Sequence, residues 1–351
     1  MSLRNSYDLP AFDWDCSRPL IEMRGIDKIY KTIAGDVQVL KTIHVDFQCG
    51  QFVSVVGRSG SGKSTLVNML TGIDHPTRGS VRVADKLIHQ MSESEMSGWR
   101  GRNLGIVFQF FQLLPMLSLL ENVMLPMDFC DLYPPAEREK RAMGLLSQMG
   151  LEKFAHKMPG AVAGGQQQSV AVARALANDP PILIADEPTG NLDGRTAEQV
   201  MQLFEEQVSL GKTVIMVTHD RDLARRAGRM LVIVDGELVN EMLPQAFPEL
   251  RHRNLLELSR RARQMIFPAG QAIQLTAQAS DNLYVIQQGE LQVVSDLVEP
   301  ANGVFHPGEW FKQSWLAGLG SYSLRAGPAG VELLEIPASG IPLPAPWRSQ
   351  P

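Results

Sequence analysis

A glycine-rich stretch follows the apolar run Phe52–Val56 and is the first part of the chain that could do chemistry. It reads Gly57-Arg58-Ser59-Gly60-Ser61-Gly62-Lys63-Ser64-Thr65. Glycines in such a turn let backbone N–H groups curl around phosphate oxygens, and a helix that starts there adds its positive end. Lys63 is expected to reach the β- and γ-phosphates of a nucleotide, and Ser64 is expected to hold Mg²⁺. The expected phosphate-binding set also contains Gly57, Ser59, Gly60, Gly62 and Thr65.

A second apolar run, residues 182–185, ends in two carboxylates, Asp186 and Glu187. Asp186 is expected to bind the metal, and Glu187 to polarise a water molecule against the γ-phosphate. A glycine-rich loop alone is weak evidence. A strand–loop–helix context, a full GxxxxGKS pattern and a strand-borne Asp-Glu pair rarely coincide by chance. Together they predict a P-loop nucleotidase that uses Mg²⁺.

The segment that must position these groups spans residues 20–240 and alternates short apolar runs with longer helical stretches. This alternation is typical of a parallel α/β sheet. The predicted strands are residues 52–56, 104–108, 182–185, 214–218 and 231–234, with a short strand at 237–239 after the turn Asp235-Gly236. The predicted helices are residues 64–70, 137–149, 167–177 and 196–210. The expected fold class is an α/β P-loop NTPase domain.

The bulk composition is that of a globular protein. The 351 residues are enough for two domains, with 44% hydrophobic and 20% charged residues. A net charge of -5 gives no general attraction to nucleic acid, so no nucleic-acid partner is expected. There is no run of about 18 apolar residues that could span a membrane. The N-terminal extension, residues 1–19, is acidic and is not expected to be a signal peptide.

The chain has three cysteines, Cys16, Cys49 and Cys130. Their number is odd, they are widely spaced, and they fit no metal-ligand pattern. We therefore expect free thiols in a reducing cytosol.

The character of the sequence changes after residue 240. Residues 241–263 contain two prolines and a basic stretch, which we interpret as a solvated linker helix rather than an anionic-lipid contact, because Glu249 and Glu257 dilute the charge. Residues 264–337 have short strands separated by Gly-Glu turns, at 283–286, 291–294, 322–324 and 331–336. They predict a small all-β barrel or sandwich. Residues 338–351 form a Pro-rich tail.

Between the two phosphate motifs, a third motif opens a predicted helix: Ala163-Gly164-Gly165-Gln166-Gln167-Gln168-Ser169. With it, residues 20–240 resemble the ATP-binding subunit of an ABC transporter. The family's signature Leu-Ser-Gly-Gly-Gln corresponds to Val162-Ala163-Gly164-Gly165-Gln166. In that family two subunits pack head to tail, and the signature helix of one faces the γ-phosphate bound by the other. The resemblance implies a homodimer that binds ATP and Mg²⁺, with Ala163, Gly164, Gly165 and Gln166 contacting the nucleotide.

Four further residues take roles from this resemblance. Gln109 matches the loop glutamine that touches Mg²⁺ or the attacking water, and Asp193 in Asn191-Leu192-Asp193 belongs to the loop that crosses the dimer interface. His219 matches the switch histidine that contacts the γ-phosphate. Tyr30 fits the aromatic residue that stacks on adenine, although an edge-strand core tyrosine is the alternative.

The chain departs from the family at two positions. Ala163 replaces the signature serine, which removes one hydroxyl donor to the γ-phosphate; such a bond is worth roughly 1.5–3 kcal/mol. Ser169 stands where relatives usually have arginine, so an ion pair behind the signature helix is expected to be lost. Because Lys63, Asp186 and Glu187 are all present, we expect a slow but competent ATPase.

The branch of the family is indicated by three stretches: Phe108-Gln109-Phe110-Phe111-Gln112-Leu113-Leu114-Pro115, Leu120-Glu121-Asn122-Val123-Met124-Leu125-Pro126 and Asp186-Glu187-Pro188-Thr189-Gly190-Asn191-Leu192-Asp193. They resemble the subunits that serve lipoprotein-releasing, macrolide-efflux and cell-division permeases. The resemblance implies a subunit that drives a membrane permease from the cytoplasmic face of the inner (plasma) membrane. The alternative is a signalling subunit whose ATP-dependent closure gates an envelope enzyme without transport.

Residues 264–337 resemble a cyclic-nucleotide-binding domain. The matching stretches are Phe267-Pro268-Ala269-Gly270-Gln271, Leu283-Tyr284-Val285-Ile286, Gly289-Glu290-Leu291 and Pro307-Gly308-Glu309-Trp310-Phe311. Ligand-binding members have a Gly-Glu pair after the last stretch and an arginine further on, where this chain has Lys312-Gln313 and Gly320. A cyclic phosphate would lack its bidentate partner. We expect a degenerate domain used for dimerisation or docking, with no cyclic nucleotide bound; a sensor of another ligand is the alternative.

Overall fold

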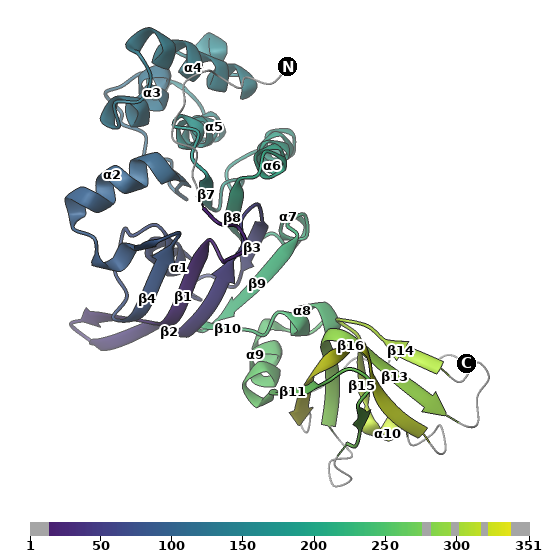
Figure 1. The fold of residues 1–351 in the computed structure, drawn as a ribbon. Helices are drawn as coiled ribbons and strands as arrows, with labels where there is room; N and C mark the ends of the chain where they lie inside the picture. The colour runs from purple at the N-terminus through teal and green to yellow at the C-terminus, as the bar shows by residue number, and fades with distance from the viewer. Residues whose placement is uncertain (1–13, 276–281, 296–301, 317–321, 338–351) are drawn as a thin grey trace. The chain divides into compact units, whose positions relative to one another are not determined.

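The structure is a computed structural model that describes residues 14–275, 282–295, 302–316 and 322–337 (Figure 1). Most of the N-terminal extension, the Pro-rich tail at 338–351 and Gly320 therefore lie outside the described residues. The chain divides into two compact units, Met1–Glu237 and Leu238–Pro351, with the division close to the change in sequence character. In the part of the chain that the structure describes, no helix has both the length and the apolar character needed to cross a membrane.

The first unit is built on a six-stranded sheet with the order β10-β9-β3-β8-β7-β6. Adjacent strands from β9 to β6 pair in parallel, which confirms the predicted parallel sheet. Every residue of β3, β7 and β8 is buried, because both faces of a parallel sheet are covered by helices. The strands are β3 (Phe52–Val56), β6 (Leu104–Val107), β7 (Ile182–Asp186), β8 (Thr213–Thr218), β9 (Arg229–Val234) and β10 (Glu237–Leu238).

The four predicted helices correspond to α1, α4, α5 and α6, with small shifts at their ends, whereas α2, α3 and α7 were not predicted. Helix α5 begins at Gly164 rather than at residue 167, because the Gln166 side chain accepts the Ala163 N–H at 3.0 Å and caps the earlier start. One apolar core joins α3 to α6 and the sheet, and it includes Leu119, Val170 and Val214. The helices are α1 (Lys63–Leu70), α2 (Glu93–Asn103), α3 (Leu119–Phe129), α4 (Pro135–Gln148), α5 (Gly164–Leu176), α6 (Gly194–Ser209) and α7 (Arg221–Ala224).

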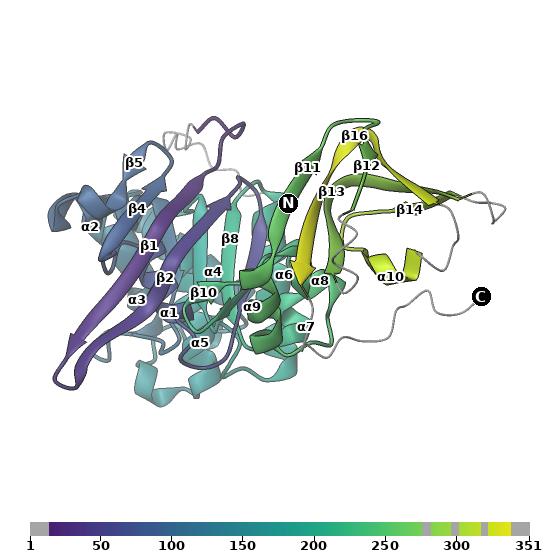
Figure 2. The ribbon, with the colours of Figure 1, turned by 90° about the horizontal axis from the view of Figure 1, so that it is seen from below.

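A second, antiparallel sheet in this unit was not predicted as such. Its order is β2-β1-β4-β5, with β1 at Ile21–Thr32, β2 at Gly35–Phe47, β4 at Arg78–Val83 and β5 at Lys86–Leu87. Strands β1 and β2 run side by side as a long hairpin (Figure 2). Helix α1 packs against β2 of this sheet and against β7 of the parallel sheet. The glycine-rich loop that precedes α1 is thus supported from both sheets.

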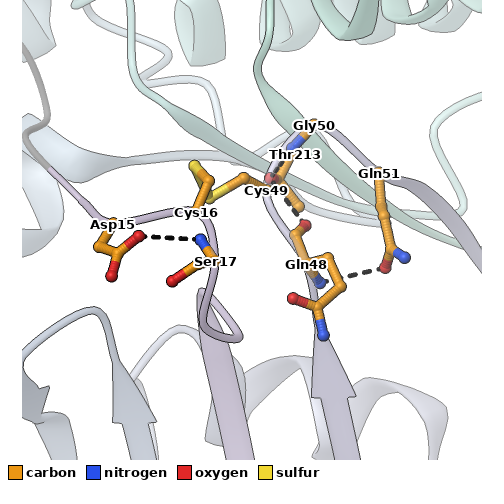
Figure 3. The surroundings of a disulfide bond; sticks show 8 residues. All are labelled: Asp15, Cys16, Ser17, Gln48, Cys49, Gly50, Gln51 and Thr213. Atoms are coloured by element: carbon orange, nitrogen blue, oxygen red, sulfur yellow. Dashed lines mark hydrogen bonds between the residues drawn. A yellow bond between two sulfur atoms is a disulfide. The ribbon is translucent and has the colours of Figure 1, made fainter.

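Cys16 and Cys49 form a disulfide, with their Cα atoms 5.6 Å apart (Figure 3). The expectation of three free thiols was therefore wrong for these two residues, whereas Cys130 is free. The physical reason is the pairing of β1 with β2. Because Ile21 lies opposite Phe47, the segment that enters β1 and the segment that leaves β2 meet at one end of the hairpin. Residues far apart in sequence are brought together there.

The second unit begins with helices α8 (Met242–Ala246) and α9 (His252–Arg261), where a linker helix was predicted, and continues as an antiparallel β structure. Its main strand order is β11-β16-β13-β14, while β12 pairs with β16 and β15 with β13. The remaining elements are β11 (Arg263–Phe267), β12 (Ala272–Ile273), β13 (Asn282–Ser295), β14 (Asn302–Phe305), β15 (Trp310–Lys312), α10 (Gln313–Leu316) and β16 (Tyr322–Pro337).

Two pairs of predicted short strands in this unit are in fact two long strands. Residues 283–286 and 291–294 both belong to β13, and residues 322–324 and 331–336 both belong to β16. The register of β13 against β16 shifts around Gly289, whose φ is 77°. A Cβ on Gly289 would overlap the carbonyl oxygen of Gly330, so glycine is required for the bend. The Gly-Glu sequence marks a bulge within a strand rather than a turn between strands.

Candidate functional site

The expected catalytic residues gather at one edge of the parallel sheet, where four strands end. In register, Val56 of β3 lies beside Thr218 of β8, and Asp186 of β7 lies beside Val217 of β8. Val107 of β6 lies beside Ala185. Since the strands are parallel, the segments that follow them emerge at the same edge, which is where ligands bind in open α/β sheets. The glycine-rich loop, Asp186-Glu187, His219 and Gln109 are therefore brought to one place.

The glycine-rich loop has the backbone conformation that its sequence predicts. Gly60 and Gly62 have φ values of 76° and 106°, which side-chain-bearing residues rarely adopt. A Cβ on Gly57 would overlap the Ile233 carbonyl oxygen. The buried ammonium of Lys63 donates to the carbonyl oxygens of Gly57 and Arg58, both at 3.0 Å. The loop thus encloses a cation, while Ser59 and Ser64 are exposed and Thr65 is half-buried.

Asp186 has the environment expected of a metal ligand. Its residue is 7% exposed, and its Oδ1 atom is buried with no hydrogen-bond partner among the described residues. Burial raises the pKa of this carboxyl, while the Ser64 hydroxyl and the Lys63 charge act in the opposite direction. A buried, unsatisfied carboxylate oxygen is costly unless an ion or donor completes it.

These donors fit Mg²⁺. This ion prefers oxygen ligands and is usually held by one or two carboxylates together with substrate phosphates and water. Asp186 and the exposed Ser64 hydroxyl offer such oxygens, and Gln109 lies exposed at the same edge, two residues after β6. Within the described ranges there is no group of three His, Cys, Asp or Glu residues that could hold a metal unaided.

Glu187 and His219 form a hydrogen-bonded pair at this edge. The Oε2 atom of Glu187 lies 2.8 Å from Nδ1 of His219. The Glu187 side chain is 11% exposed, whereas that of His219 is 72% exposed. Glu187 has a left-handed backbone with φ of 51°, and its N–H donates to the Val217 carbonyl oxygen at 2.9 Å. The Glu187 main chain is therefore held by β8, and its carboxylate by an accessible imidazole.

The signature-like motif forms the amino end of α5. Ala163 is the exposed N-cap residue, and its methyl group cannot accept the free N–H groups of the first turn. Gly164 and Gly165 open the helix, and a Cβ on Gly165 would lie 3.1 Å from the Asn191 carbonyl oxygen. Ser169 is buried and donates through Oγ to the Gly165 carbonyl oxygen at 3.1 Å. The serine expected from the resemblance would also have capped this helix, so its absence leaves α5 without a side-chain cap.

The loop after Gln109 is held by two residues that the sequence interpretation missed. The Arg174 guanidinium donates to the carbonyl oxygens of Gln112 at 2.7 Å and Phe111 at 2.9 Å. The fully buried Asn122 side chain accepts the Leu114 N–H at 2.8 Å and donates to three carbonyl oxygens nearby. Arg174 follows the apolar stretch Val170–Ala173 of α5, and Asn122 lies between Leu120 and Val123 of α3; a polar residue within an apolar stretch was the available signal.

Two further expected residues have other partners in this structure. Asp193 caps α6, because its Oδ1 accepts the Thr196 N–H at 3.0 Å. Tyr30 lies on β1 and donates its hydroxyl to Asp74 Oδ2 at 2.8 Å. Neither contact is incompatible with the role expected for the residue.

Comparison with known proteins places these features in a family. The model of the ABC transporter family matches residues 40–190. The chain is 43% identical over 247 residues to the macrolide export ATP-binding/permease protein MacB of Nitrosomonas europaea, covering 68% of this chain and 37% of that protein. It is 44% identical over 226 residues to the pyoverdine export ATP-binding/permease protein PvdT of Pseudomonas entomophila, covering 64% of this chain and 34% of that protein. The chain thus spans about a third of the length of these relatives.

A shorter relative is covered completely. The uncharacterized ABC transporter ATP-binding protein MJ0796 of Methanocaldococcus jannaschii is 42% identical over 234 residues, which are 66% of this chain and 100% of that protein. The solved dimeric, post-hydrolysis structure of this ATP-binding cassette, bound to ADP and Pi, aligns with a TM-score of 0.60 at 42% identity. It covers 62% of this chain and 96% of the solved one. The predicted family resemblance and the P-loop NTPase fold are confirmed.

Proposed function

The chain belongs to the ABC transporter ATP-binding family, and we propose that it binds and hydrolyses ATP to drive a membrane permease. The observation that carries this proposal is the carboxyl edge of the parallel sheet. There, an enclosed ammonium from Lys63, an unsatisfied carboxylate oxygen from Asp186 and the Glu187–His219 pair follow adjacent strands. A cation, a metal ligand and an oriented base at one edge are what attack of water on a γ-phosphate requires.

Each residue of this edge has a defined task in the proposed reaction. Lys63 and the N–H groups of the glycine-rich loop bind the β- and γ-phosphates. Glu187 accepts a hydrogen bond from the attacking water and takes its proton, while His219 keeps the carboxylate in place and faces the γ-phosphate. Asp186, Ser64 and Gln109 would hold Mg²⁺, which when bound neutralises negative charge on the phosphate oxygens.

We propose that the active form is a homodimer, in which α5 of one subunit completes the site of the other. The solved relative is described as dimeric. In the single chain the amino end of α5 is exposed, so a second subunit can contact it. The glycines at this helix start offer N–H groups to an anion. The hydroxyl absent at Ala163 leaves the completed site one donor short, so the proposed ATPase is slow.

The proposed permease contact is an apolar surface beside Gln109. Phe110, Met116 and Phe129 are 77%, 74% and 80% exposed, on the loop after β6 and at the end of α3. Large apolar side chains left exposed on this segment of the chain favour a partner surface. This loop is held by Arg174 of α5, so movement at the contact can reach the nucleotide edge. The relatives MacB and PvdT are export ATP-binding/permease proteins, which supports a permease partner and a place at the cytoplasmic face of the inner membrane.

We propose that the second unit is a degenerate cyclic-nucleotide-binding-like domain used for dimer contacts or docking. Its interior is filled by aromatic side chains: Tyr284, Phe305 and Phe311 are buried, with ring centroids 5.2 Å and 5.0 Å apart. A filled interior favours a structural role. Titration calorimetry with cyclic AMP and cyclic GMP is expected to give no heat, and micromolar binding of either would overturn this part of the proposal.

The transporter function is tested by isolating the closed complex. A tagged Glu187→Gln full-length chain, solubilised from native membranes with Mg-ATP, is expected to retain a multi-spanning permease that mass spectrometry identifies. Lys63→Ala is the matched control, because it is expected to lose ATP binding and therefore the trapped complex. Recovery of soluble proteins alone, together with ATP hydrolysis by the wild type, would move the function to a signalling role.

A further inference from the structure

The ring of Tyr30, which is expected to stack on adenine, contacts an ion pair between Lys28 and Asp74. Lys28 and Tyr30 lie two residues apart on β1, so their side chains share a face of the sheet. The Lys28 ammonium donates to Asp74 Oδ1 at 2.6 Å, and the Tyr30 hydroxyl donates to Asp74 Oδ2 at 2.8 Å. One carboxylate thus binds both residues.

The Lys28 ammonium also covers the Tyr30 ring. Its Nζ atom lies 4.8 Å from the ring centroid, within the range of a cation–π contact. A second hydrogen bond runs from Nζ to the His75 carbonyl oxygen at 2.8 Å. Lys28 is 9% exposed, so solvent does not screen these contacts as it would at the surface. Because a cation occupies one face of the ring, a base can stack only on the other face.

Asp74 is in turn anchored to the helix that follows the glycine-rich loop. The N–H groups of Ile73 and Asp74 both donate to the Asn68 carbonyl oxygen of α1, at 3.0 and 3.2 Å. The Asp74 carboxylate also accepts the His75 N–H at 2.7 Å. Burial is the main cause that raises the pKa of the Tyr30 phenol, and the Asp74 carboxylate adds to it. A hydrogen bond with the Thr65 hydroxyl, on the first turn of α1, lowers this pKa in part. The position of the Tyr30 ring is therefore tied to α1, the helix whose amino end is proposed to bind phosphate.

We propose that Lys28 and Asp74 are positioning residues that fix the Tyr30 ring, and with it the adenine, at a set distance from the phosphate loop. This inference rests on the proposed ATP-binding function. The register between β1 and β2 shifts on both sides of Lys28, and such irregularities re-aim side chains within a strand. In this proposal Lys28 and Asp74 act on the base through the tyrosine, because their hydrogen bonds run to each other, to Tyr30 and to His75.

The test compares binding of ATP with binding of inorganic tripolyphosphate, which has the phosphates but no base. Calorimetry on the full-length chain is expected to give about 3- to 10-fold weaker ATP binding for Tyr30→Phe and for Asp74→Ala, and about 5- to 100-fold for Tyr30→Ala. Tripolyphosphate affinity is expected to stay at the wild-type value in all three. The double variant Tyr30→Phe/Asp74→Ala is expected to be no weaker than Asp74→Ala, because both changes break the same link.

The matched control is Asp27→Asn on the same strand. Asp27 accepts the Thr42 N–H at 2.8 Å and the Gln38 amide at 3.0 Å, so it is also a bonded carboxylate of this sheet but away from the ring. Its ATP affinity is expected to be unchanged. Lys28→Met serves as the second probe if Asp74→Ala does not fold, and it is expected to weaken ATP binding alone.

Three outcomes would overturn the inference or its premise. Equal losses of ATP and tripolyphosphate affinity would mean that Asp74 supports α1 rather than the ring. Wild-type ATP affinity in Tyr30→Phe and Lys28→Met would remove the positioning role while leaving the ATP-binding function intact. A wild-type chain that binds no ATP would reject the function and this inference together.

Discussion

The carboxyl edge of the parallel sheet and the amino end of α5 are the two parts of the proposed ATP site, and they differ in how completely the expected side chains are present. At the edge, Lys63, Asp186 and Glu187 are buried, and they lie at or after the ends of β3 and β7, the two strands that flank β8. At the amino end of α5, Ala163 is exposed, and its side chain has no polar group. The carboxyl edge thus has all of its expected side chains and is enclosed, whereas the amino end of α5 lacks one and is exposed.

The difference follows from what each part must satisfy within the single chain. A change of Lys63 or Asp186 would disturb buried charges, whose uncompensated loss costs several kcal/mol. A change from serine to alanine at an exposed helix start costs only about 1 kcal/mol, because water can satisfy the free N–H groups. The fold therefore tolerates loss of chemistry at the amino end of α5 far better than at the carboxyl edge. The following predictions test this asymmetry.

The largest effect is expected at the edge. Glu187→Gln keeps the shape of the side chain but cannot take a proton from water, so we expect ATP turnover to fall by about 10²–10⁴-fold with ATP binding retained. Phosphate release and equilibrium binding on the same preparation measure the two quantities. Glu205→Gln on α6, which removes an ion pair to Arg226 instead, is the control and is expected to keep its turnover. A Glu187→Gln rate equal to that of the wild type would leave the edge without its proposed base.

The disulfide should separate the stability of this unit from its chemistry. Cys16 and Cys49 close a loop with a sequence separation of 33, and loss of such a cross-link is expected to lower the free energy of unfolding by about 3–4 kcal/mol. Next to it, the Gly50 N–H donates to Thr213 Oγ1 at 3.0 Å (Figure 3). This bond joins the segment before β3 to the first residue of β8, away from the nucleotide edge. Cys16→Ser/Cys49→Ser is therefore expected to unfold earlier in urea but to keep its turnover at 25 °C.

The control for that variant is Cys130→Ser, since Cys130 is a half-buried free thiol. It is expected to unfold within about 0.5–1 kcal/mol of the wild type. Addition of a dithiol reductant should bring the wild type to the behaviour of the double variant and leave the double variant unchanged. If reductant has no effect on the wild type, the cross-link does not stabilise the unit.

The contrast between the two parts also explains how far the sequence could be interpreted. The strands β3, β7 and β8 are continuous apolar runs, and the glycine-rich loop and Asp186-Glu187 follow them directly, so local pattern was sufficient. The antiparallel sheet was missed because its half-exposed strands have no such runs; β1 and β2 alternate irregularly and contain register shifts.

Features that depend on contacts between distant segments were not accessible from the sequence. The pairing of Cys16 with Cys49 exists because β1 and β2 are neighbours, and no spacing rule expresses that. The roles of Arg174 and Asn122 depend on a loop that folds back over two helices. The family resemblance predicts a lost phosphate donor at Ala163, but the lost helix cap could be inferred only once the start of α5 was known.

A smaller effect is expected at the amino end of α5, and in the opposite direction. Ala163→Ser restores a hydroxyl that can cap α5 and donate to the γ-phosphate, so turnover is expected to rise by about 10- to 100-fold. Stability should rise by about 1 kcal/mol from the cap. Ala163→Gly separates the two roles, because glycine is an acceptable N-cap but has no hydroxyl. This variant is expected to be more stable than the wild type but to have the same turnover. Equal rates for the serine and glycine variants would assign the gain to capping alone.

The smallest effect is expected at Ser169, four residues after Gly165 on the same helix. The Ser169 hydroxyl donates to the Gly165 carbonyl oxygen, which already accepts a helical N–H, so its removal leaves no buried acceptor unsatisfied. Ser169→Ala is expected to change the free energy of unfolding by no more than about 0.5–1 kcal/mol and turnover by less than about twofold. Urea unfolding and phosphate release measure both. A large fall in turnover would mean that this hydroxyl sets the position of Gly165. The weakness of the α5 end would then lie in the orientation of the helix start rather than in the donor missing at Ala163.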